Sequence, residues 1–201
     1  MKMDVIEAIN KRYSAKLFTG KKIPEEDILK LKEAIRFAPS WFNIQPWKIK
    51  VVEDKEMLSK LQQAAYGQKQ VGTASHLFVF CSINNFDENN SKIVDKMKQK
   101  EIPKEKIARF ISVLDSFLSS NSEEKLREVS QNDSFLAAEN LMLSATSLGY
   151  ASCPVGGFDK RKFKEILKLS SDLEPVLIVP VGYGADEPRV KIRLDNNDIF
   201  F

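Results

Sequence analysis

The sequence is poor in the residues that most often bind metals or act as catalytic bases. Among its 201 residues are two cysteines, Cys81 and Cys153, and one histidine, His76. These three residues cannot build a tetrahedral zinc site. Both cysteines lie in apolar stretches typical of buried strands, so we expect free, buried thiols. His76 opens such a stretch, and we interpret it as a hydrogen-bonded structural residue.

Other signatures are missing as well. The chain lacks the GxSxG motif of a serine hydrolase, a GxGxxG motif after a strand, and the GxxxxGK phosphate loop. These absences favour chemistry supplied by a bound cofactor. No apolar run is long enough to span a bilayer, and the net charge of +3 is too small to favour nucleic acid or an anionic membrane. We therefore expect a cytoplasmic protein with neither partner.

Helix and strand patterns alternate along the chain. Helical periodicity follows Asp4, Pro24 and Asp54 and recurs over residues 135–148 and 160–169, whereas strands are predicted over 47–51, 77–83, 150–153 and 176–181. Without glycine-rich nucleotide loops, this interleaving indicates an α+β fold with a mixed central β-sheet flanked by helices. The long helix places Phe135 on its predicted buried face. We find no internal repeat or linker, which favours one domain over residues 1–201.

Residues 84–132 differ in composition from the rest. The segment is polar, rich in lysine and serine, and interrupted at Pro103. We interpret it as a helical excursion that forms a lid, with Phe110 or Phe117 projecting over a bound ligand and setting the size of the molecule that enters. Its mixed charges favour a solvated helix face over an anion site.

Four polar or aromatic clusters stand out from this framework. Residues 12–16, RYSAK, place two cations around a hydroxyl, which suits a phosphate but also an ordinary solvated helix end. Residues 38–47, APSWFNIQPW, form a loop with unusual aromatic content, for which core packing is the alternative. Amides at Gln68 and Gln70 precede a buried strand, and adjacent glycines in residues 154–159, PVGGFD, let a flat ligand approach the backbone.

In this order, the clusters resemble the FMN-dependent nitroreductase family, which also holds flavin and dihydropteridine reductases. The resemblance is carried by Arg12-Tyr13-Ser14 with Lys16, the 38–47 loop, Gln68 and Gln70, the PVGGFD run, and Lys191-Ile192-Arg193. It covers nearly the whole chain outside residues 84–132. It implies a nitroreductase-like fold and a homodimer with two flavins at its interface.

The resemblance also assigns roles to these residues. Arginine forks suit phosphate oxygens, and the positions that match the phosphate clamp are Arg12, Lys191 and Arg193. Positions along the ribityl chain and the pyrimidine ring match Ser14, Lys16, Gln68 and Gln70, and further cofactor contacts match Tyr13, Pro154, Val155 and Gly157. The loop that reaches the flavin from the partner subunit matches Pro39, Ser40, Trp41 and Asn43. Gly156 matches the residue whose backbone N–H faces flavin N5, where many relatives carry glutamate.

The implied activity is ping-pong electron transfer from NADH or NADPH, through FMN, to nitroaromatics or quinones. Two alternatives remain open. One is the same scaffold with another substrate, such as a flavin, a dihydropteridine or an enone. The other is a non-enzymatic FMN-binding protein, since a fold and a cofactor do not fix a substrate.

Overall fold

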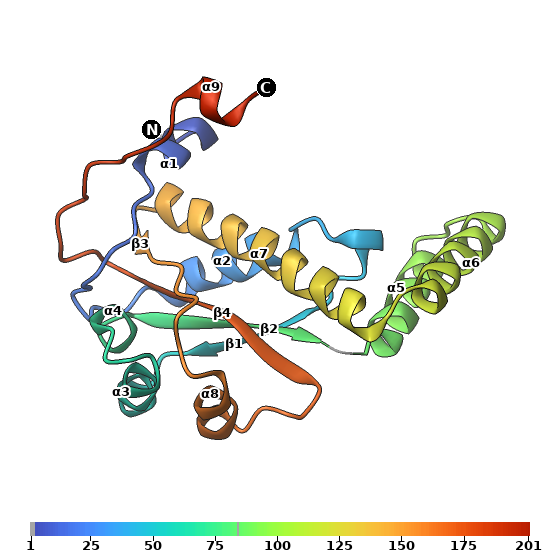
Figure 1. Ribbon diagram of the computed structural model, residues 1–201, viewed down its shortest axis with the longest axis horizontal. Coiled ribbons are helices and arrows are strands. Elements are labelled where there is room, and N and C mark those ends of the chain that lie inside the picture. The colour runs from blue at the N-terminus through green and yellow to red at the C-terminus, as the bar shows by residue number, and fades with distance from the viewer. Residues whose placement is uncertain (1–2, 84) are drawn as a thin grey trace.

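The computed structural model describes residues 3–83 and 85–201 (Figure 1). The helices are α1 (Val5–Lys11), α2 (Glu25–Arg36), the short 3-10 turn η1 (Trp41–Asn43), α3 (Lys55–Ala64), α4 (Lys69–Gly72), α5 (Asp87–Gln99), α6 (Lys104–Ser120), α7 (Glu123–Ser147), α8 (Lys160–Leu167) and α9 (Asn196–Ile199). The strands are β1 (Trp47–Val52), β2 (His76–Ile83), β3 (Ala151–Ser152) and β4 (Leu173–Gly182). The helices expected after Asp4 and Asp54 are present, and the side chains of both aspartates cap them, each accepting a backbone hydrogen bond of 2.8 Å.

The four strands form one sheet in the order β1-β2-β4-β3, and every adjacent pair is antiparallel. Helices α2 and α7 cover one face of the sheet, and α3 and α8 cover the other (Figure 1). The predicted α+β class is confirmed. The expected mixed sheet is wrong for these ladders, because the parallel pairing among described residues is an isolated bridge between Ser14 and Ser152.

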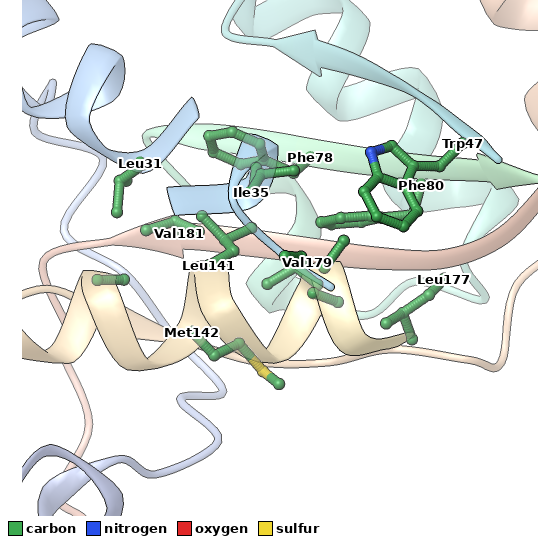
Figure 2. Packing of buried hydrophobic residues seen from close by; sticks show 14 of the residues in the cluster. Leu31, Ile35, Trp47, Phe78, Phe80, Leu141, Met142, Leu177, Val179 and Val181 are labelled. Carbon is green, nitrogen blue, oxygen red and sulfur yellow. The ribbon is translucent and has the colours of Figure 1, made fainter. Parts of the chain in front are cut away.

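Alternation along β2 and β4 divides the core between the two faces, since successive strand side chains point to opposite sides. Phe78, Phe80 and Val179 pack against α2 and α7, where Leu31 and Leu141 meet them (Figure 2). On the opposite face, a second cluster joins β2 and β4 to α3 and α8 through Leu77, Val79, Ile178, Leu61 and Phe163. Burial on both faces explains why β2 is predicted so clearly as a central strand.

The excursion is shorter than the sequence indicates. Helices α5 and α6 form a hairpin that projects from the body, whereas α7 begins at Glu123 and runs back across the sheet (Figure 1). Residues 123–132 therefore belong to the long central helix and not to the lid. The predicted first lid residue, Asn84, lies outside the described residues. Phe135 was expected on the buried face of α7, but its side chain is 50% exposed, because the contact face turns away there.

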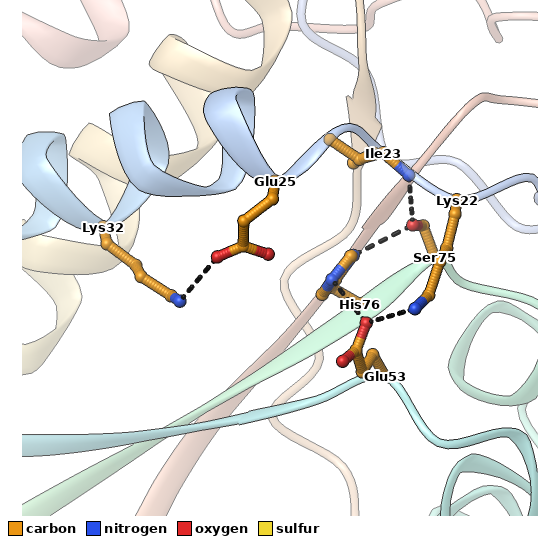
Figure 3. A network of polar contacts seen from close by, with 7 residues as sticks. All are labelled: Lys22, Ile23, Glu25, Lys32, Glu53, Ser75 and His76. Atoms are coloured by element: carbon orange, nitrogen blue, oxygen red, sulfur yellow. Dashed lines mark hydrogen bonds and ion pairs between the residues drawn. The ribbon is translucent and has the colours of Figure 1, made fainter.

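His76 is a structural residue at the start of β2, as its sequence context predicts. Its Nδ1 lies 2.9 Å from Ser75 Oγ, which also accepts a 2.8 Å hydrogen bond from the Ile23 backbone (Figure 3). On the other side of the ring, Nε2 lies 3.4 Å from Glu53 Oε2, and Glu53 also pairs with Lys22 at 2.9 Å. Burial lowers the pKa of His76, which keeps the imidazole neutral in this network.

Candidate functional site

Three predicted cations gather beside the end of α1, although they come from the two ends of the chain. Lys191 Nζ donates to the main-chain oxygen of Ile9 at 3.0 Å and to that of Asn10. The pKa of Lys191 is lowered by desolvation and by the neighbouring positive charges of Arg12 and Arg193. Nη1 of Arg12 is buried, and no hydrogen-bond partner reaches it within residues 3–83 and 85–201. Such a cluster favours an anion between its members.

Ser14 and Lys16 continue this site toward β3. Ser14 forms the parallel bridge with Ser152, whose side chain is fully buried and whose Oγ has no partner in the described part of the chain. Lys16 Nζ lies 3.5 Å from Cys153 Sγ. The local fold thus holds Ser14 beside β3 and the Lys16 ammonium group beside Cys153.

Asp186 organises this region and is absent from the sequence-based site. Its Oδ2 accepts a 2.8 Å hydrogen bond from the Lys16 backbone, and its main-chain oxygen accepts a 3.2 Å bond from the hydroxyl of Tyr13. A Cβ on Gly184 would lie 2.2 Å from that hydroxyl, so only glycine fits there. Tyr13 therefore forms the wall of the site. The YGAD run after the last strand is the sequence signal that could have indicated it.

The amide cluster and the glycine run are also brought together. Gln68 Nε2 donates to the main-chain oxygen of Gly157 at 2.8 Å, and Gln70 Nε2 donates to Gln68 Oε1 at 2.9 Å. A Cβ on Gly156 or Gly157 would meet nothing within 4 Å. Val155 is buried and pairs with Ile178, which anchors the run to β4. The glycine backbone is consequently open on its outer side.

We call this surface the cationic site and define it by Arg12, Ser14, Lys16, Gln68, Gln70, Pro154–Gly157, Lys191 and Arg193. Its donors are cations, amides and backbone N–H groups, and its buried, unpartnered Arg12 Nη1 calls for an oxygen acceptor from a ligand. Beside the site, Ser152 Oγ and Asp186 Oδ1 are also buried without partners in the described chain, and each can accept a hydrogen bond. A phosphorylated planar ring such as FMN fits this donor set. Groups of three or more His, Cys, Asp or Glu side chains able to hold a metal do not occur among the residues described.

The remaining predicted residues lie elsewhere. We define the aromatic loop as Ser40–Gln45, which includes η1 and follows Pro39. This loop lies next to the α5–α6 hairpin, whereas α1, β3 and α4 lie at the other end of α7 (Figure 1). A single chain therefore does not bring Ser40, Trp41 and Asn43 to its own cationic site.

The aromatic loop has a strained backbone that several elements hold in place. Phe42, Asn43 and Gln45 all have positive φ, between 49° and 55°, at a cost of roughly 1–2 kcal/mol for each non-glycine residue. The Trp41 backbone donates to Asp133 Oδ2 of α7 at 2.9 Å, and the Gln45 backbone donates to Ser40 Oγ at 2.9 Å. The strain persists because these contacts over-determine the loop.

The lid aromatics contact this loop. The ring centroids of Phe117 and Trp41 are 3.6 Å apart, and those of Phe110 and Phe42 are 6.4 Å apart. Phe110 also packs against a cluster that includes the buried Ile44, Ile83 and Leu114. Within one chain, Phe110 and Phe117 thus support the aromatic loop and stand away from the cationic site.

Comparison with known proteins agrees with this geometry. The model of the nitroreductase family matches residues 9–183. A Staphylococcus epidermidis protein assigned as an NAD(P)H nitroreductase is 32% identical, over 99% of this chain and 96% of its own. Within the described residues, no helix combines the length and apolarity needed to cross a membrane.

Solved structures give the same answer. A protein of Staphylococcus epidermidis described as an NAD(P)H:FMN oxidoreductase superimposes with a TM-score of 0.90 at 30% identity, covering 98% of this chain and 94% of its own. A nitroreductase of Exiguobacterium sibiricum solved in complex with FMN gives 0.89 at 27% identity, with coverage of 98% and 95%. The chain therefore belongs to the nitroreductase family, a family of FMN-dependent oxidoreductases that use NAD(P)H.

Proposed function

We propose that this protein passes electrons from NADH or NADPH to small, flat acceptors, namely nitroaromatics and quinones, by a ping-pong mechanism. FMN at the cationic site would supply the two-electron exchange. The observation that carries the proposal is the buried, unpartnered Nη1 of Arg12 beside Lys191 and Arg193. Three cations at this density need an anion, and the phosphate of FMN meets that need.

The residues around the phosphate clamp then have separate tasks. Lys16 would place a positive charge at the polar edge of the ring, where it favours added negative charge. Gln68 is fixed by Gly157 and holds Gln70, so the two amides offer a fixed set of ring contacts. The open surface outside Gly156 would admit the flat ring and leave its backbone N–H facing it. No side-chain acid need act on every acceptor, and protons would then come from water.

We also propose a homodimer in which each flavin contacts both chains. The cationic site and the aromatic loop lie at opposite ends of α7, so one chain supplies only part of the contacts (Figure 1). Val190, Ile192 and Leu194 alternate with charged residues in the C-terminal segment and are 89%, 86% and 69% exposed. Such an alternating apolar segment is suited to cover a second chain.

The test is an activity assay on the purified full-length protein. We expect a yellow protein with about one FMN per chain that oxidises NADH or NADPH when menadione or a nitroaromatic is added. Double-reciprocal plots at several acceptor concentrations should be parallel, as a ping-pong mechanism requires. Bound FMN without turnover would identify an FMN-binding protein and not an enzyme. Protein that takes up no FMN on reconstitution would contradict the whole proposal.

A further inference from the structure

The aromatic loop is held by side chains from three helices, and none of these side chains is in the predicted cofactor set. Asp133 of α7 accepts the hydrogen bond from the Trp41 backbone at 2.9 Å. Asn89 of α5 donates to the main-chain oxygens of Ile44 and Gln45, at 3.0 and 2.7 Å. Phe117 of α6 lies against the Trp41 ring, as described above. The loop conformation is therefore set from outside the loop.

Asp133 has a specific place among these contacts. Its side chain is only 7% exposed although it carries a carboxylate, and it reaches the first residue of η1 at the point where the backbone turns into the left-handed region. A buried carboxylate is costly unless it is paired or hydrogen-bonded, so its presence there indicates a task that an apolar residue would not perform. That task is to hold the Trp41 N–H.

We propose that Asp133 is a positioning residue for the cofactor site of the partner subunit. By fixing the aromatic loop, Asp133 sets how tightly the partner holds FMN. The α5–α6 hairpin acts in the same way through Asn89 and Phe117, so it governs FMN retention and not acceptor size. The inference rests on the proposed function, in which the loop of one chain completes the cationic site of the other.

Three variants of α7 test the role of Asp133 in the full-length dimer. Asp133→Leu removes the acceptor, Asp133→Asn keeps an acceptor oxygen, and Glu139→Gln changes an exposed carboxylate on the same helix. We expect Asp133→Leu to raise the Kd of FMN about tenfold, a loss typical of one hydrogen bond to a charged group. Asp133→Asn and Glu139→Gln should stay within about twofold of the wild type. Flavin fluorescence during titration reports the Kd.

A second pair of variants tests the hairpin and does not depend on Asp133→Leu folding. Asn89→Ala releases the two loop carbonyls, and Phe117→Ala removes the ring that lies tilted against Trp41. Each should raise the Kd of FMN about threefold and leave the relative kcat/KM for large and small quinones unchanged. Val113→Ala, at a 45% exposed position on α6, is the matched control.

The outcomes separate this inference from the proposed function. If Arg12→Ala weakens FMN binding while a folded, dimeric Asp133→Leu binds FMN with the wild-type Kd, the positioning role is overturned and the cationic site stands. If Arg12→Ala also leaves FMN binding unchanged, the proposed function fails first. A change confined to the ratio of large to small acceptors in Phe117→Ala would overturn the role of the hairpin and return it to that of a lid.

Discussion

The cationic site and the aromatic loop, at the two ends of α7, differ in how far their polar groups are satisfied within the chain. At the cationic site, charged and polar atoms lie close together, and three atoms in or beside it, Arg12 Nη1, Ser152 Oγ and Asp186 Oδ1, are buried without partners in the described chain. At the aromatic loop, the strained backbone is matched by donors and acceptors from the surrounding helices. The first region is built for a ligand that brings its own oxygens. The second is already ordered, which suits it to the contact with a partner chain that the proposed dimer requires.

The largest effect should come from the phosphate clamp. We expect Arg12→Ala to raise the Kd of FMN by about 10- to 100-fold, because charge-assisted hydrogen bonds contribute roughly 1.5–3 kcal/mol. Titration of the apoprotein with FMN, followed by flavin fluorescence, measures this change.

Apoprotein stability provides the control, because the Arg12 guanidinium has a buried nitrogen that nothing in the described chain satisfies. Its removal should leave the Tm of the apoprotein nearly unchanged. Arg161→Ala, at an exposed position of α8, should alter neither quantity. A large loss of apoprotein stability in Arg12→Ala, with FMN binding intact, would make Arg12 a structural residue and remove the contrast between the two regions.

The next effect concerns the joining of the two regions across a dimer. Ile192→Glu places a charge on the exposed apolar stripe of the C-terminal segment, between Lys191 and Arg193. We expect roughly tenfold weaker self-association, since about 1.5 kcal/mol of apolar burial, the low end for an isoleucine side chain, would be lost. FMN affinity should fall with it, because a ligand that binds only the dimer stabilises it by mass action.

Sedimentation and flavin fluorescence on one dilution series report both quantities for Ile192→Glu. Phe200→Glu and Ile199→Glu extend the test to the end of the chain, where we expect the same coupled loss. The control is Lys168→Glu, at an exposed position just after α8, because the neighbouring Leu169 is partly buried and a glutamate there would destabilise the fold. A monomer that keeps FMN with unchanged affinity would show that each chain holds its flavin alone.

The sequence predicts the cationic site better than the aromatic loop, for a physical reason. Arg12, Ser14 and Lys16 are close in sequence, so their residue types alone indicate an anion site. Strand β2 is also predicted easily, because burial on both faces requires a continuous apolar run. Asp186 and Asp133 act through backbone N–H groups of residues far away in the chain. The YGAD run draws attention to Asp186, but the local sequence of neither aspartate indicates which distant backbone N–H it binds. The predicted lid boundary is wrong because the first turns of α7 continue the polar pattern of the lid until the helix meets the sheet.

Stability against pH should distinguish the scaffolds at the two ends. Burial lowers the pKa of His76 below its ordinary 6.5, despite the opposing charges of Glu53 and Glu25, with Lys22 and Lys32 acting in the same direction as burial. The unfolded chain then binds more protons than the folded chain below about pH 6.5, so stability is lost as pH falls through the folded pKa. We expect urea unfolding from pH 8 to 5 to show this loss, at no more than about 1.4 kcal/mol per pH unit. His76→Gln should flatten it, and equal slopes for both proteins would contradict the assignment.

The smallest effect is expected from Asp133, and its sign is opposite. Burial raises the pKa of this carboxyl above its ordinary 3.8, while the Trp41 N–H offsets part of the increase. The folded chain therefore binds more protons than the unfolded chain above pH 3.8, so the stability contribution is full below that pH and falls as pH rises through the folded pKa.

The variant Asp133→Asn tests this sign, because it removes the titration and keeps an acceptor for the Trp41 N–H. In the same urea experiments, the free energy of unfolding of Asp133→Asn relative to the wild type should increase between pH 4 and 7. This increase should be smaller than the change expected from His76. The wild type retains a carboxylate there despite this cost. If Asp133→Asn is more stable and binds FMN with unchanged affinity, then the acceptor oxygen of residue 133, and not its charge, positions the loop. A variant that instead loses stability as pH rises would show that the ionised carboxylate is favoured in the fold and that its bond to Trp41 outweighs burial.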